Sequence, residues 1–162
     1  MARPPPSERA LTAALAPYER LIEIGVGRRP EIARALADRG RDVVAIDIDV
    51  SAAAREAAAQ GAAKSTEAAG EGSLRVAAAD VTALATGNDE RAVRDEIGPD
   101  AIGDGVDAVY ARNLPAELQR PTVALAERLD AACLFTTLGF EEPVVDVRRR
   151  ATESGTVVYV TR

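Results

Sequence analysis

Residues 21–32 read LIEIGVGRRPEI, and this stretch decides the fold of the chain. The apolar run at 21–24 predicts a buried strand. Gly25 and Gly27 predict a tight turn, because glycine tolerates positive φ and lets a ligand approach the backbone closely. Pro30 predicts the first turn of a helix, where a missing N–H costs no hydrogen bond. The stretch therefore predicts the first strand–turn–helix unit of an α/β domain, with free turn amides above the strand.

Glu23 and Pro30 separate two kinds of ligand for this turn. A dinucleotide-binding turn has a third glycine that allows close helix–strand packing, but here Pro30 stands at that position, after Arg28 and Arg29. The remaining pattern, acidic-x-Gly-x-Gly from Glu23 to Gly27, resembles the first motif of S-adenosylmethionine-dependent methyltransferases. A carboxylate at Glu23 suits a ligand that offers hydroxyls or an amine. The alternative is an ordinary strand–helix turn whose glycines serve backbone geometry alone.

A second apolar run ends in an acid roughly twenty residues after the turn. Residues 43–46 are followed by Asp47, at the separation where an acid binds ribose hydroxyls in a β-α-β unit. A carboxylate there can accept both hydroxyls and would repel a 2′-phosphate. The alternative is that Asp47 caps the next helix, although Asp49 and Ser51 are available for that cap. We expect Asp47, with Ile48 beside it, to line a nucleoside pocket.

A third apolar run, residues 74–79, leads to Asp80 and Val81. The methyltransferase resemblance implies that Asp80 faces the adenine amino group and that the Val81 amide faces the ring. A helix cap is the alternative role for Asp80, because Asp is common directly before a helix.

A fourth apolar run, residues 106–111, continues into Arg-Asn-Leu-Pro-Ala-Glu-Leu at 112–118. This segment partly resembles the fourth methyltransferase motif, in which an Asn-Pro-Pro-aromatic sequence holds a target amine. Leu114 replaces one proline and no aromatic residue follows Pro115. Asn113 is therefore carried over as a cofactor-site residue, and no catalytic residue is assigned.

Strands and helices alternate along the chain, which predicts one doubly wound, Rossmann-like three-layer α/β sandwich over residues 1–162. Its sheet should be mainly parallel with right-handed crossovers. Residues 1–6 are expected to be a disordered lead, with Ser7 capping the first helix. Residues 143–149 and 156–161 predict a terminal antiparallel strand pair. The pocket is expected outside the carboxyl ends of the first two strands.

Composition excludes several function classes. The chain is 47% hydrophobic but only 3% aromatic, so Ala, Val, Leu and Ile must build its core. It has no histidine and a single cysteine, Cys133. The lack of histidine excludes Ser-His-Asp and Cys-His mechanisms. A single cysteine excludes an internal disulfide, and with no histidine beside it we expect no zinc site. Cys133 lies in an apolar run and should be a small buried hydrophobe. No apolar run has the length of a membrane span and no signal pattern is present, so a cytoplasmic location is expected.

The charge pattern indicates habitat and partners. Net charge is −6 and the pI is about 4.8, so the surface should repel phosphate backbones and bind no nucleic acid generically. Lys64 is the one lysine among 20 basic residues, a bias typical of salt-adapted or high-GC organisms. Arg28, Arg29 and residues 148–150 are interpreted as solvated strand ends or as partners of nearby carboxylates. An anionic ligand group near Arg28 or Arg29 is the alternative.

The chain as a whole resembles an archaeal family of short Rossmann-like proteins, Uncharacterised Protein Family zero-one-four-six. The resemblance rests on residues 23–30, 110–118 and 135–139, and it extends over nearly the whole length from Tyr18. The family implies a fold but no activity, so two hypotheses stay open. One is an S-adenosylmethionine-binding methyltransferase of unassigned substrate, which can act largely through proximity and orientation. The other is a non-catalytic nucleoside-binding or interaction module that keeps the pocket.

Overall fold

The computed structural model describes residues 4–65, 72–86, 105–139, 141–152 and 155–161. The elements follow one another as α1 (Pro6–Leu15), β1 (Arg20–Ile24), α2 (Glu31–Asp38), β2 (Asp42–Asp47), α3 (Ala52–Ser65), β3 (Ser73–Ala78), α4 (Val81–Thr86), β4 (Ala108–Ala111), α6 (Ala116–Arg128), β5 (Ala132–Phe135), β6 (Arg148–Ala151) and β7 (Val157–Val160). Strands and helices alternate through most of this order, as the sequence predicts.

The strands form one sheet in the order β3-β2-β1-β4-β5-β7-β6. Neighbours among the first five strands are parallel, and β7 runs antiparallel to both β5 and β6. The doubly wound α/β fold with a terminal antiparallel pair is therefore confirmed. The strand order reverses between β1 and β4, and ligands of open α/β sheets bind at such a switch point, outside the carboxyl ends of the strands.

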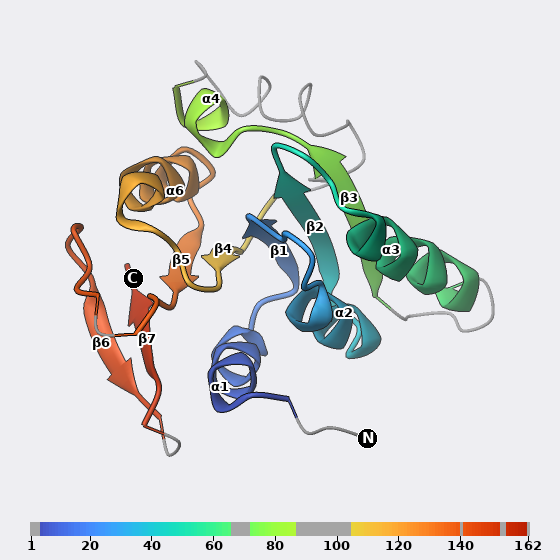
Figure 1. Ribbon diagram of the computed structural model, residues 1–162, viewed down its shortest axis with the longest axis horizontal. Coiled ribbons are helices and arrows are strands. Elements are labelled where there is room, and N and C mark those ends of the chain that lie inside the picture. The colour runs from blue at the N-terminus through green and yellow to red at the C-terminus, as the bar shows by residue number, and fades with distance from the viewer. Residues whose placement is uncertain (1–3, 66–71, 87–104, 140, 153–154, 162) are drawn as a thin grey trace.

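Helices cover both faces of the sheet (Figure 1). Helices α1, α2 and α3 pack on one face, while α4 and α6 pack on the other. Because both faces are covered, the central strands read as nearly continuous apolar runs, and the four residues from Leu21 to Ile24 are all buried. Glu23 is the charged exception in this run, so its burial needs a chemical explanation.

The two ends of the chain differ from the sequence-based expectation. Helix α1 begins at Pro6, after Pro5 at the N-cap position, and no side chain caps it. Ser7 therefore lies inside the helix, because proline already has the φ angle that a first helical turn requires. Strand β6 begins at Arg148 and not at residue 143. Before it, the Val144 amide donates to Gln119 Oε1 of α6 at 2.7 Å, so a side chain replaces the strand ladder there.

Cys133 lies in β5 as a free and fully buried thiol. Burial raises the pKa of this thiol to about 12, so it stays protonated at neutral pH and packs as a small apolar side chain. The part of the chain that the structure describes contains no helix long and apolar enough to cross a membrane. Within the same ranges, no three His, Cys, Asp or Glu side chains are grouped so that they could hold a metal ion.

Candidate functional site

The glycine turn after β1 is anchored to β2. Gly25 and Gly27 have φ angles of 70° and 56°, the left-handed region that glycine tolerates best. The Gly25 and Val26 amides both donate to Ile46 O, at 2.9 and 3.2 Å, and the Gly27 amide donates to Asp47 Oδ2 at 2.8 Å. The expectation of free turn amides is therefore wrong for these three donors, because the end of β2 satisfies them. The turn is left without these donors for a phosphate group.

Space in front of the turn is nevertheless open. A Cβ atom added at Gly25 or at Gly27 would meet no heavy atom within 4 Å. A ligand can therefore lie directly against the backbone here, although it cannot use those three amides. This favours recognition by shape and by side chains on the neighbouring strands.

Asp47 is the last residue of β2, as the sequence predicts. It does not cap α3. That cap is Ser51, whose Oγ accepts from the Ala54 amide at 3.1 Å and donates to Gly27 O at 2.6 Å. The Asp47 Oδ2 instead accepts the hydrogen bond from the Gly27 amide in the turn, whereas its Oδ1 accepts no hydrogen bond from the described residues. One oxygen thus supports the turn and the other remains available to a ligand hydroxyl.

A cleft with a volume of about 60 Å³ lies at the carboxyl ends of β1, β2 and β3. Five of the predicted site residues meet in its lining, namely Gly25, Asp47, Ile48, Asp80 and Val81. The Ile48 side chain is 75% exposed and forms an apolar lip, while Val81 is buried. Pockets for drug-sized ligands usually measure about 300–1,000 Å³. This cleft is therefore too small to enclose a drug-sized ligand by itself and could form only the floor of a larger site.

Asp80 has a structural role in addition to its place in the cleft. Its Oδ1 accepts from the Thr82 amide at 2.9 Å, and its backbone oxygen accepts from the Leu84 amide at 3.0 Å. Asp80 therefore caps α4, which is the alternative that the sequence left open. Its exposed side chain still faces the cleft, so the cap fixes the orientation of this carboxylate.

Glu23 is buried beneath the turn and does not line the cleft. It is 3% exposed, and the parallel register places it beside Tyr110 of β4. Burial raises the pKa of Glu23 to about 8, the neighbouring Tyr110 hydroxyl and Arg112 lower it, and Glu31 and Asp47 raise it. Neither Glu23 Oε2 nor the Tyr110 hydroxyl has a partner at full hydrogen-bond geometry. Glu23 is thus a mostly neutral carboxyl at pH 7, with an unsatisfied oxygen.

An ion cluster around a second buried carboxylate, Glu8, was not predicted from the sequence. Glu8 of α1 is 4% exposed, and its Oε1 accepts from Arg29 Nη2 at 2.8 Å and from Arg112 Nη1 at 3.0 Å. The interpretation of Arg29 as the partner of a carboxylate is confirmed, and that carboxylate is Glu8. Glu8 lies 104 residues from Arg112, so no local pattern could reveal the cluster.

The remaining predicted residues lie apart from the cleft. Asn113 is exposed at the end of β4 with φ 53°, and its amide donates to Thr136 Oγ1 at 2.9 Å. It is not among the residues that line the cleft. In β6, Arg149 lies 4.0 Å from Glu142 and 5.9 Å from the centroid of the Tyr159 ring, as expected for a solvated strand.

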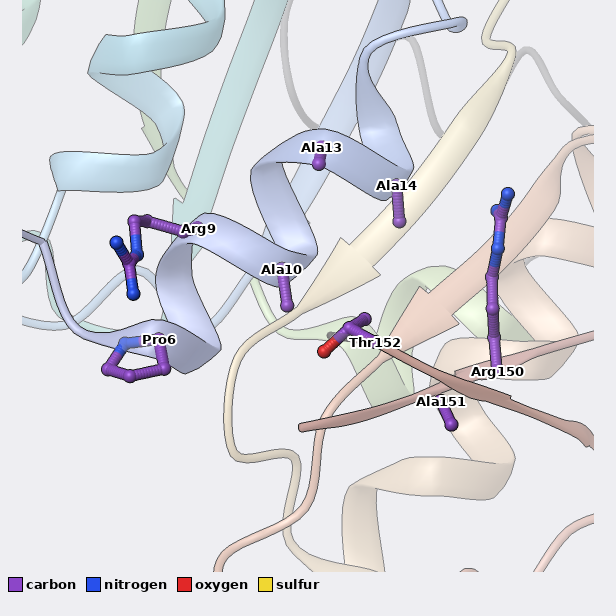
Figure 2. A pocket seen from close by; sticks show the side chains of 8 residues that line it. All are labelled: Pro6, Arg9, Ala10, Ala13, Ala14, Arg150, Ala151 and Thr152. Atoms are coloured by element: carbon purple, nitrogen blue, oxygen red, sulfur yellow. The ribbon is translucent and has the colours of Figure 1, made fainter. Parts of the chain in front are cut away.

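A larger hollow, about 670 Å³, lies between α1 and β6 (Figure 2). Small side chains dominate its lining, including Ala10, Ala14 and Ala151. Figure 2 shows Arg9 and Arg150 extending away from each other on opposite sides of it. None of the predicted site residues lines this hollow, so volume alone does not identify the functional site.

The fold is similar to those of solved methyltransferases. Magnesium protoporphyrin IX methyltransferase of Synechocystis PCC 6803, with S-adenosylmethionine bound, matches with TM-score 0.52 and 14% identity over 94% of this chain and 75% of that one. The bifunctional kinase-methyltransferase WbdD matches with TM-score 0.53 and 14% identity over 95% of this chain and 37% of that one. A Burkholderia thailandensis 1,6-didemethyltoxoflavin-N1-methyltransferase, with S-adenosylhomocysteine bound, matches with TM-score 0.50 and 13% identity over 96% of this chain and 60% of that one. At these identities the likeness establishes a methyltransferase-like Rossmann fold.

Sequence relatives lie among the archaea. UPF0146 proteins from two strains of Halobacterium salinarum are each 35% identical to this chain over 164 residues, covering 100% of this chain and 98% of the relative. The family model matches residues 8–62 and 60–162. The chain therefore belongs to the Uncharacterised protein family UPF0146.

Proposed function

We propose that the protein binds S-adenosylmethionine at the carboxyl ends of β1, β2 and β3 and acts as a methyltransferase of unassigned substrate. The observation that carries this proposal is the convergence of Gly25, Asp47, Ile48, Asp80 and Val81 from three strands on one cleft. The likeness in fold to methyltransferases with bound S-adenosylmethionine or S-adenosylhomocysteine supports it.

The side chains of the cleft fit an adenosyl group. The uncommitted Asp47 Oδ1 can accept from ribose hydroxyls, and the oriented Asp80 carboxylate can accept from an exocyclic amine. Ile48 and Val81 supply apolar surface for the flat faces of a base. A dinucleotide fits less well, because the Gly25, Val26 and Gly27 amides that would cradle a pyrophosphate already have partners.

The bound S-adenosylmethionine would supply an activated methyl group, so the protein would need mainly to bind and orient it. Holding two reactants in line can lower a barrier by several kcal/mol, up to about 7–11 kcal/mol in favourable cases. Asp47, Asp80 and the apolar lip would fix the adenosyl group, and the open space at Gly25 and Gly27 would let the rest of the ligand cross β1. Nothing in this scheme requires a general base.

A non-catalytic nucleoside-binding module is the second candidate. The exposed position of Asn113, outside the cleft, favours it, because the segment that resembles a methyl-acceptor motif does not meet the cofactor residues. Both candidates share the binding step and differ only in transfer.

Calorimetric titration of the full chain with S-adenosylmethionine and S-adenosylhomocysteine in high salt tests the shared step. One-to-one binding of both is expected, and the absence of binding by either overturns the proposal. Incubation with methyl-labelled S-adenosylmethionine and an archaeal cell extract then separates the candidates. Label transfer above that of an Asp47→Asn variant identifies an enzyme, and binding without transfer identifies the module.

A further inference from the structure

Two arginines from different strand ends converge on one carboxylate inside the protein. Arg29 belongs to the glycine turn after β1, and Arg112 directly follows β4. Both donate to the same atom, Glu8 Oε1, at 2.8 and 3.0 Å. The Glu8 side chain is only 5% exposed, whereas the Arg29 and Arg112 side chains are 51% and 18% exposed. The arginine pair therefore remains partly open to the surface while its carboxylate partner is buried.

The position of this pair matches the line of the proposed ligand. Along the carboxyl edge of the sheet, β3 provides Asp80, β2 provides Asp47, β1 provides the turn and β4 provides Arg112. Strands β2 and β4 are separated by two strand spacings, roughly 10 Å. A nucleoside held at Asp47 would reach Arg112 only if its sugar carried an extension across the open turn. An extension that ends in a carboxylate would meet two guanidinium groups.

A second observation marks the same place. Glu23 Oε2 and the Tyr110 hydroxyl are buried there and lie close enough to act on each other, but neither has a partner at full hydrogen-bond geometry. The charge of Arg112 also acts on the Glu23 carboxyl. Buried polar atoms are normally satisfied, so an unsatisfied pair needs an explanation. An ammonium group beside the carboxylate of the ligand would supply the missing donor for Glu23. Arginines and a carboxyl that lie side by side are the complement of an α-amino-carboxylate.

We propose that Arg29 and Arg112 form a carboxylate subsite for an α-amino-acid group, and that the Glu8 carboxylate occupies this subsite from within the chain until such a ligand competes for it. The inference rests on the proposed nucleoside site and specifies its second half. Glu8 is a suitable internal occupant, because it offers the arginines the same charge-assisted hydrogen bonds that a ligand carboxylate would. When the ligand binds, its carboxylate replaces the Glu8 carboxylate at the two arginines, and the Glu8 side chain of α1 moves away from them.

The test compares S-adenosylhomocysteine, which has an amino-acid group, with 5′-methylthioadenosine, which lacks one. Affinities are measured by calorimetry for the wild type, Glu8→Gln, Arg112→Gln and the control Glu31→Gln. Glu31 is an exposed carboxylate at the start of α2 whose charge also acts on Glu23, but no hydrogen bond or ion pair joins it to the arginine pair in the described structure. It controls for the general loss of a negative charge.

Glu8→Gln should bind S-adenosylhomocysteine about tenfold more tightly and 5′-methylthioadenosine unchanged, because the competing charge is removed. Arg112→Gln should bind S-adenosylhomocysteine about tenfold more weakly, again without an effect on 5′-methylthioadenosine. Glu31→Gln should change the affinities for S-adenosylhomocysteine and 5′-methylthioadenosine by the same factor. If Glu8→Gln does not fold, as judged by its urea midpoint, Arg112→Gln alone decides the result.

Two outcomes overturn the inference in distinguishable ways. The Glu8 and Arg112 variants could change the affinities for both ligands equally or leave both unchanged. Either result shows that the cluster is a structural ion triad. The proposed function then survives, because the wild type still binds S-adenosylhomocysteine. If neither ligand binds the wild type or any variant, the inference and the proposed function both fall.

Discussion

Glu23 is a carboxyl group that folding removes from water, so its titration is linked to stability. Burial raises the pKa of Glu23 from its ordinary value of 4.5 to about 8 in the folded protein. A raised carboxyl pKa adds stability that is fully present below the unfolded pKa and is lost as pH rises through the folded pKa. Between about pH 5 and about pH 8, this group should therefore lower the free energy of unfolding by an amount on the order of a few kcal/mol.

Replacement of Glu23 by Gln should remove this pH dependence, because glutamine keeps the shape of the side chain and does not ionise. Urea unfolding at several values between about pH 5 and about pH 8 measures the effect. The wild type should lose stability across the window, and Glu23→Gln should lose much less. Glu31→Gln is the control, since it leaves the buried carboxyl in place. A Glu23→Gln profile parallel to that of the wild type would contradict the burial argument.

One oxygen of Asp47 accepts from the Gly27 amide, and the proposed function assigns the other oxygen to the ligand; two substitutions separate these roles. Asp47→Asn keeps an oxygen acceptor for the Gly27 amide but loses the charge, so it should unfold nearly like the wild type while binding nucleoside more weakly by roughly 1–3 kcal/mol. Asp47→Ala removes both the acceptor for the Gly27 amide and the charge, so it should also lower the free energy of unfolding by about 1–2 kcal/mol. Urea midpoints and calorimetric affinities report the two effects. Asp49→Ala should change neither strongly, and an equal loss of affinity there would remove the special role of Asp47.

At the scale of elements, the glycine turn joins β1 to α2 and, in the proposed function, is also the surface that the ligand crosses. Gly25 has φ 70°, and a Cβ there would meet nothing within 4 Å. Gly25→Ala should therefore lower the free energy of unfolding by about 1–2 kcal/mol through backbone strain alone. Its methyl group would nevertheless fill the space that the ligand needs. We expect a loss of nucleoside affinity much larger than the loss of stability.

The turn between β6 and β7 offers a matched control for this variant. Gly155 has φ 82° and also open space at its Cβ position, but it is not among the residues lining the cleft. Gly155→Ala should show a similar fall in the urea midpoint and unchanged affinity for S-adenosylhomocysteine. If both alanine variants bind equally well, the ligand does not pass over the turn.

Local patterns predicted the strand end, the helix cap and the turn of the site better than the hydrogen bonds and ion pairs between its elements. The end of β2 at Asp47, the cap at Ser51 and the turn at Gly25 follow from short-range rules on apolar runs, caps and glycine geometry. The pairing of the turn amides with Ile46 O and Asp47 could not be read from the same stretch, because it depends on how β1 and β2 align. The Glu8 cluster was missed for the same reason, since its members meet only after α1 folds over the switch point.

At the scale of the molecule, alternation of strands and helices was enough to predict a doubly wound sheet. The order β3-β2-β1-β4-β5-β7-β6 was not contained in that alternation, because strand order depends on which crossover packs on which face. The order also determines which groups are neighbours at the carboxyl edge of the sheet. It places the ends of β3, β2, β1 and β4 side by side, so acids, an open turn and an arginine pair form one continuous edge.

That edge also decides which class of ligand the whole molecule should prefer. S-adenosylhomocysteine can use Asp47, Asp80 and the open turn without needing phosphate donors, whereas NAD carries two phosphates toward a turn whose Gly25, Val26 and Gly27 amides are engaged. The net charge of −6 further disfavours the dinucleotide. A ligand that binds only the folded state adds about 2.7 kcal/mol at one hundred times its dissociation constant, or roughly 5–10 °C in the midpoint for a chain of this size. Thermal unfolding with each ligand at equal concentration measures the difference, and 5′-methylthioadenosine shows how much of it the nucleoside half supplies. Stabilisation by NAD with none by S-adenosylhomocysteine would mean that the turn opens to accept phosphate, and the assignment of this edge to an adenosyl amino acid would be wrong.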